Sequence, residues 1–215
     1  MKTRPVTTAV GILCLVAAVI FTHAGGTAAG DTPLGENEIR ECYLSSYRAQ
    51  TYEEAIKAVL PLKDLPAQRY LANLRLGYLY YLNGKLADAK LHYQTAIKAA
   101  PEALEPKLGC MLPLLAQGKW DEIETLAQQV LRIDPNNYYA NLRLAFTFRL
   151  EKKYQQADTL ASRMLQLYPT DTLFMVELAL TKQALNQKEA AKKLFSDLLN
   201  LDPENFIAKQ QLGKQ

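Results

Sequence analysis

Residue types that most often carry catalysis or bind metals are scarce in this chain. After residue 30, His92 is the single histidine, and Cys42 and Cys110 are the only cysteines. The sequence contains no CxxC, HExxH, GxGxxG or Walker-type motif. A nucleophile activated by histidine would have to use His92, which we expect to face solvent on a helix. We therefore predict no enzyme activity, no metal and no cofactor.

Neighbouring carboxylates, which in other settings form acid–base pairs, have a simpler interpretation here. Glu53 and Glu54 fall where a helix is expected to begin, and so do Asp121 and Glu122. Acidic side chains in the first turn of a helix interact favourably with the positive end of its dipole. We interpret both pairs as helix starts.

The N-terminus has the pattern of an export signal. Lys2 and Arg4 precede an apolar run over residues 6–21, and small residues follow over 24–30. We predict a signal peptide over residues 1–29, cleaved near Ala29, and a periplasmic or secreted protein. The alternative is an uncleaved membrane anchor, although the 16 apolar residues of this run fall short of the roughly 20 that a span needs.

The net charge argues against a nucleic-acid partner. The chain has 215 residues, is 49% hydrophobic and 22% charged, and carries a formal net charge of +3. Lys2 and Arg4 account for two of these charges, so the rest of the chain carries only +1. Lysine and arginine form no cluster elsewhere, whereas nucleic-acid-binding proteins gather them on one face.

A 34-residue period organises the remainder of the chain. Prolines recur at this interval: Pro101, Pro135, Pro169 and Pro203. Residues 72–76 and 140–144, two periods apart, are identical. Within each period, apolar residues recur at helical spacing in two runs, separated by breaks such as Asn83–Gly84, where glycine can adopt the left-handed conformation. Each period is predicted to form two helices, with the proline ending the second.

This pattern resembles the tetratricopeptide repeat family, whose unit is a 34-residue helix–turn–helix. Residues 70–103 match the family pattern best and hold its residues at seven positions: Leu76, Gly77, Tyr80, Ala89, Tyr93, Ala96 and Pro101. Asn73 stands where the family usually has tryptophan. The resemblance implies an all-α fold, a right-handed α-solenoid of antiparallel helix pairs.

The phase of the period divides the chain into units. After a linker over residues 30–35, we expect a degenerate repeat and then four regular ones, over 36–69, 70–103, 104–137, 138–171 and 172–205. Residues 206–215 are predicted to form a capping helix over the last apolar face. Pro61 should shorten the second helix of the first repeat. Cys42 and Cys110 fall two repeats apart, which is too far for a disulfide.

In this family, positions 2, 5, 9 and 12 of each repeat line a groove on the concave face. The resemblance therefore implies a ligand-binding surface, for which we select twelve residues: Leu71, Leu74, Tyr78, Tyr81, Leu108, Leu112, Tyr139, Leu142, Phe146, Arg149, Leu173 and Val176. Four further residues hold the remaining positions: Glu105, Leu115, Leu180 and Gln183. Thirteen of these sixteen residues are apolar or tyrosine, which favours an apolar peptide or helix as ligand. The alternative is that some of them pack between neighbouring first helices.

Positions 5 and 9 also exclude one kind of ligand. Family members that clamp a terminal carboxylate use lysine and asparagine there, whereas this chain has residues such as Leu74 and Tyr78. We expect no such clamp. Arg149, with Arg75 and Arg143 on first helices, remains able to orient one acidic group. The alternative for the two identical Asn-Leu-Arg stretches is solvated repeat surface.

The first helix of the third repeat departs from the pattern because it contains Gly109 and Pro113. An interior proline removes a backbone hydrogen bond and kinks a helix. We hypothesise that this kink widens or redirects the groove. The alternative is an irregularity that the fold tolerates.

Three functions remain open. We favour a non-enzymatic protein–protein interaction scaffold of the cell envelope that binds a protein or peptide partner. The alternative is a structural protein that forms homo-oligomers by stacking repeats through its incomplete end at residues 206–215. A third hypothesis is that the segment around Leu34 fills the groove of its own chain. Contact with a membrane is expected only if the N-terminal segment stays uncleaved.

Overall fold

The computed structural model describes residues 34–213. The predicted signal peptide and most of the predicted linker lie outside the described residues, so both stay predictions. From Gly35 onward the chain forms one compact unit. Within residues 34–213, no helix combines the length and apolar character needed to cross a membrane.

The described chain is all α-helical, as predicted. Its helices run in this order: α1 (Glu36–Arg48), α2 (Tyr52–Val59), a 3₁₀ turn η1 (Leu60–Leu62), α3 (Arg69–Leu82), α4 (Leu86–Ala99), α5 (Glu105–Gln117), α6 (Trp120–Ile133), α7 (Tyr138–Leu150), α8 (Tyr154–Leu167), α9 (Thr172–Ala184), α10 (Lys188–Leu201) and α11 (Phe206–Leu212). The helices from α1 to α10 thus follow one another as five pairs, and α11 comes after the last pair. The second helix of the first pair, α2, has only 8 residues and gives way to a 3₁₀ turn that contains Pro61.

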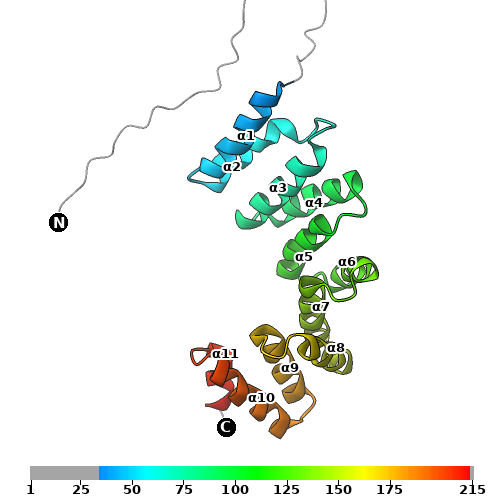
Figure 1. The fold of residues 1–215 in the computed structure, drawn as a ribbon, viewed down its shortest axis with the longest axis vertical. Coiled ribbons are helices and arrows are strands. Elements are labelled where there is room, and N and C mark those ends of the chain that lie inside the picture. The colour runs from blue at the N-terminus through cyan, green and yellow to red at the C-terminus, as the bar shows by residue number, and fades with distance from the viewer. Residues whose placement is uncertain (1–33, 214–215) are drawn as a thin grey trace, which may run out of the picture. The chain divides into compact units, whose positions relative to one another are not determined.

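Successive helices pack against one another in chain order (Figure 1). The first helices α3, α5, α7 and α9 also contact each other in sequence along one side of the stack, whereas α1 packs mainly on α2. The second helices α4, α6 and α8 cover the opposite side. Each repeat therefore depends on its immediate neighbours for packing.

In each of the four regular repeats, the turn is closed by one residue in the left-handed conformation. Gly84 and Gly118 have φ angles of 74° and 65°, as the sequence predicts for glycine at a break. The equivalent residues of the next two repeats, Lys152 and Asn186, have φ angles of 62° and 59°. The backbone geometry of the turn is therefore kept even where a side chain makes it unfavourable.

The core is a row of apolar clusters between first and second helices. One cluster joins Tyr93 of α4 to Met111 of α5 and Ile123 of α6. Another joins Phe195 of α10 to Ala208 of α11. The short helix α11 thus covers apolar surface that α9 and α10 would otherwise expose.

Polar residues occupy the position where the family usually has tryptophan. Asn73 is buried and its Nδ2 donates to the carbonyls of Lys63 and Arg69, at 2.8 and 2.7 Å. Asn141, two repeats later, is also buried and donates to the Pro135 carbonyl at 3.1 Å. The interpretation of these stretches as solvated surface is therefore wrong for both asparagines. Through these hydrogen bonds, Asn73 and Asn141 hold the loops that precede α3 and α7.

Cys42 and Cys110 are not joined to each other. Cys110 is buried in the cluster around Tyr93, whereas Cys42 is half-buried. Burial raises the pKa of the Cys110 thiol to about 11, which is the behaviour of a core residue rather than of a reactive thiol.

Candidate functional site

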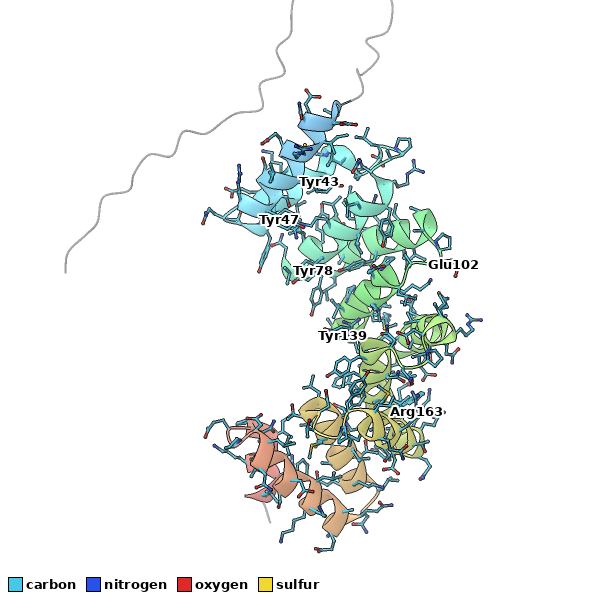
Figure 2. The ribbon with its side chains drawn as sticks, in the orientation of Figure 1. Tyr43, Tyr47, Tyr78, Glu102, Tyr139 and Arg163 are labelled. Carbon is cyan, nitrogen blue, oxygen red and sulfur yellow. The ribbon has the colours of Figure 1, made fainter. Side chains whose placement is uncertain are left out.

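A groove of about 450 Å³ opens beside α1, α3 and α5. We call it the N-terminal groove. It is lined by Tyr43, Tyr47, Leu71, Leu74, Arg75, Tyr78, Tyr93, Glu105, Gly109 and Leu112. In Figure 2, Tyr43, Tyr47 and Tyr78 lie on one side of the stack, and Glu102 and Arg163 lie on the opposite side.

The floor of the groove is built around Tyr93, which reaches from α4 between α3 and α5. Both helices carry glycine where the ring passes. A Cβ atom on Gly77 would lie 2.8 Å from Cδ1 of Tyr93, and one on Gly109 would lie 2.2 Å from its Cε1. No side chain fits at either position while the ring stays in place. The two glycines therefore make room for the Tyr93 ring between α3 and α5.

Gly109 also removes a side chain from the groove. The residues one repeat before and after it are Arg75 and Arg143, both long and charged. Helix α5 itself is continuous from Glu105 to Gln117, with the buried Pro113 inside it. The groove is therefore open beside α5 because Gly109 has no side chain to fill it. The effect of Pro113 on the groove stays a hypothesis.

The walls of the groove are largely aromatic. Tyr47 and Tyr78 are 70% and 44% exposed, and Leu71 is 49% exposed. The hydroxyl of Tyr43 donates to Oε1 of Gln68 at 3.1 Å. These side chains from α1 and α3 offer apolar surface without a covering element in the described part of the chain.

Two charged residues border this apolar surface. The guanidinium carbon of Arg75 lies 4.1 Å from the centre of the Tyr47 ring, which is a cation–π contact. The carboxylate of Glu105 accepts a hydrogen bond from the Tyr70 hydroxyl at 3.2 Å. The groove therefore presents one positive and one negative group on an aromatic background.

Four of the twelve residues predicted for ligand binding line this groove: Leu71, Leu74, Tyr78 and Leu112. The other eight lie elsewhere on the first helices: Tyr81, Leu108, Tyr139, Leu142, Phe146, Arg149, Leu173 and Val176. Of these, Tyr139 and Leu173 are exposed, and Val176 is buried beside Ala208 of α11. Position 5 of the repeats, which includes Leu74, Leu108 and Leu142, contacts the core clusters. Part of the predicted surface thus packs between helices, as the alternative interpretation held.

Arg149, expected to be available for an acidic ligand, is paired within the chain. Its Nε and Nη2 donate to the two carboxylate oxygens of Glu177 on α9, at 2.7 and 3.2 Å. Its guanidinium also lies 5.3 Å from the centre of the Phe146 ring. Arg143 donates to the Leu108 carbonyl, and burial lowers the pKa of its guanidinium. Both arginines therefore join neighbouring first helices.

Tyr43 and Tyr47 line the groove but were not among the residues predicted from the sequence. Tyr47 stands 34 residues before Tyr81, so the same position rule, applied to the degenerate first repeat, would have identified it. Tyr43 stands 34 residues before Gly77. This position is small in the second repeat, so the period carried no signal for an aromatic residue there.

His92 does not face solvent as expected: it is half-buried against Asn73 and Tyr80. Within residues 34–213, no group of three or more histidine, cysteine, aspartate or glutamate residues is placed to hold a metal ion.

Known proteins agree with this architecture. Residues 71–103 match the family model described as "Tetratricopeptide repeat". No curated protein sequence matches the chain. A tetratricopeptide repeat protein from Parabacteroides merdae superposes with a TM-score of 0.74 at 15% identity, covering 81% of this chain and 70% of that one. Residues 71–103 thus match one tetratricopeptide repeat, and the described chain has the fold of tetratricopeptide-repeat structures.

Two further solved structures share the fold. The protein YrrB, described as having an unusual peptide-binding site, gives a TM-score of 0.70 at 15% identity, over 83% of this chain and 91% of YrrB. The MamA protein gives a TM-score of 0.68 at 13% identity, over 78% of this chain and 93% of MamA. At such identities the likeness concerns the fold. The family matched by residues 71–103 consists of non-catalytic scaffolds, in line with the prediction that this protein is not an enzyme.

Proposed function

We propose that this tetratricopeptide-repeat protein binds an apolar peptide or helix of a partner protein in its N-terminal groove. The observation that carries the proposal is the groove itself, with exposed Tyr47, Leu71 and Tyr78 around a floor of Tyr93 and Leu112. Contiguous apolar surface of this kind usually marks an interaction site.

The proposal extends to the location of the partner. The N-terminal pattern of Lys2, Arg4 and the apolar run over residues 6–21 supports export, so the partner is proposed to be a protein of the cell envelope. Mass spectrometry of the protein isolated from its cells tests this step. A chain that begins near residue 30 is expected, and a chain that retains Lys2 would contradict cleavage.

A pair of groove substitutions tests the binding site. Leu71→Asp combined with Tyr78→Asp places two charges in the groove and should abolish capture of the partner by cross-linking in the intact envelope. The matched control is Leu91→Asp with Ile133→Asp, because both residues are exposed on second helices outside the groove. Circular dichroism should show unchanged helix content in both variants. Equal capture by the groove variant and the control would reject the proposal.

Self-association is the second candidate, and one observation favours it. Phe206, at the start of α11, is 73% exposed, and Leu201 at the end of α10 is also exposed. Both apolar side chains are therefore exposed at the end of the last repeat. Phe206→Lys keeps α11 in place and should convert an oligomer into a monomer in analytical ultracentrifugation. A protein that is monomeric before the change excludes this candidate.

A further inference from the structure

We propose that the N-terminal groove selects peptides in which an acidic side chain lies within a few residues of a large apolar side chain, and that Arg75 binds the carboxylate. This inference rests on the proposed function and names the chemistry of its ligand. It follows from the charges around the groove, which the apolar surface alone does not explain.

Arg75, the arginine that lines the N-terminal groove, has no acidic partner among the described residues. None of the ion pairs formed by residues 34–213 includes it. Its counterparts are engaged: Arg149 is bound by Glu177, and Arg143 donates to the Leu108 carbonyl. The guanidinium of Arg75 can therefore accept an anion without breaking an existing pair.

The surroundings of Arg75 hold its guanidinium in place. The group stacks on the Tyr47 ring at 4.1 Å, and its Nε lies 3.4 Å from Oγ of Ser46. Stacking uses the face of the guanidinium and leaves donors at its edge, where the planar fork can bind a carboxylate through two parallel hydrogen bonds. Arg75 is half-buried among aromatic side chains, and charges interact more strongly there than in bulk water.

Nearby carboxylates decide where the acidic side chain of the peptide can lie in the groove. Glu105 lines the same groove, and Glu53 lines an adjoining hollow of about 530 Å³ that also borders Arg75. Neither is paired with Arg75 among the ion pairs above. Glu105 would repel an acidic ligand side chain, so the carboxylate is expected at Arg75 and the apolar side chain over Tyr93 and Gly109.

A peptide-display selection tests this chemistry. A random library of 12-residue peptides is panned against the protein as isolated from expressing cells, and in parallel against Arg75→Glu and Arg132→Glu. Arg132 is exposed on α6 away from the groove, so its substitution changes the net charge equally. Wild type and the Arg132→Glu control should enrich aspartate or glutamate near leucine, phenylalanine or tryptophan. Arg75→Glu should lose this preference and enrich lysine or arginine instead.

Affinities of a selected peptide make the result quantitative. Fluorescence anisotropy should show binding weakened about fivefold by Arg75→Gln, the effect of losing one partly exposed charge pair, and unchanged by Arg132→Glu. Thermal unfolding of each variant, followed by circular dichroism, confirms that the fold is intact.

The outcomes separate this inference from the proposed function. Peptides that depend on Leu71 and Tyr78, but show no acidic preference and bind Arg75→Glu equally well, would overturn the role of Arg75 and leave the apolar groove standing. If no peptide is enriched, or if selected peptides bind the Leu71→Asp/Tyr78→Asp variant as tightly as wild type, the groove does not bind peptides and both proposals fall.

Discussion

Nδ1 of His92 lies 2.8 Å from Oδ1 of Asn73, and the same imidazole ring stacks on Tyr80 with the ring centres 5.1 Å apart. This contact joins α4 to α3 at the position where the family usually has tryptophan. Burial, reinforced by the charge of Lys63, lowers the pKa of His92 below its ordinary value of 6.5. The folded chain therefore takes up a proton on His92 at lower pH than the unfolded chain does.

The free energy of unfolding should consequently fall as the pH falls below about 6.5. Urea unfolding at pH 7.5 and at pH 5.8, compared with His92→Gln, isolates this contribution because the carboxylates are common to both proteins. The wild type should lose more stability over this interval than the variant. Parallel changes in the two proteins would show that His92 does not titrate differently on folding.

Substituting Gly109 by alanine should destabilise the protein. The added Cβ would lie 2.2 Å from Cε1 of Tyr93, and such overpacking typically costs about 1–3 kcal/mol. Denaturant unfolding measures the loss. Since the clash is with the ring, the same substitution in a Tyr93→Leu background should cost clearly less, and equal costs in both backgrounds would contradict the contact.

Replacing Lys152 by glycine should stabilise the protein by about 1 kcal/mol, because an L-residue in the left-handed conformation is strained and glycine is not. Lys152 has a φ angle of 62° and an exposed side chain. The reciprocal change, Gly118→Lys, should destabilise by a similar amount at the equivalent turn. Thermal unfolding of the pair checks both signs, and a stabilising Gly118→Lys would refute the explanation.

The pair of Arg149 and Glu177 should matter more than the surface ion pairs. Their side chains are only 17% and 10% exposed, so Glu177→Gln leaves a largely buried guanidinium without its counter-charge. We expect a loss of about 2 kcal/mol, less than for a fully buried pair. Asp197→Asn, which breaks the exposed pair with Lys193, serves as control and should change stability by under about 1 kcal/mol.

Cys110 should react slowly with thiol reagents. Its pKa of about 11 leaves little thiolate at pH 8, and the side chain is buried around Tyr93. In a chain with Cys14 and Cys42 replaced by serine, the reaction with Ellman's reagent should accelerate strongly on addition of denaturant. A rate in buffer equal to that in denaturant would show that this part of the core is open.

The repeat period was sufficient to predict the fold. Prolines at 34-residue intervals and the breaks at Gly84 and Gly118 locate the helix pairs, since backbone stops are encoded by single residues. The shortening of α2 by Pro61 follows in the same way. Burial was harder to predict: Asn73 and His92 look like surface residues in the sequence, yet they pair with each other inside the fold.

The candidate site was predicted only in part, because a position rule does not describe side-chain partners. Leu71 and Tyr78 face the groove as the rule expects, whereas Arg149 turns to Glu177, 28 residues further along the chain. Gly109 was noticed as irregular, but its effect depends on Tyr93 of the preceding helix. Such pairings become visible only when neighbouring helices are placed side by side.

The packing of each repeat on its neighbours alone has a consequence for how a ligand acts on this protein. Among the described residues, α1 and α2 form the first and shortest pair, with helices of 13 and 8 residues. Within this part of the chain, the pair borders one regular repeat instead of two. In a linear array, such an end opens locally at lower free energy than the middle does. A ligand that contacts α1, α3 and α5 together would bind the closed form and not the locally opened one, and would therefore stabilise this end. Amide hydrogen exchange in α1 should then become slower when the ligand is bound, while exchange in α9 and α10 stays unchanged.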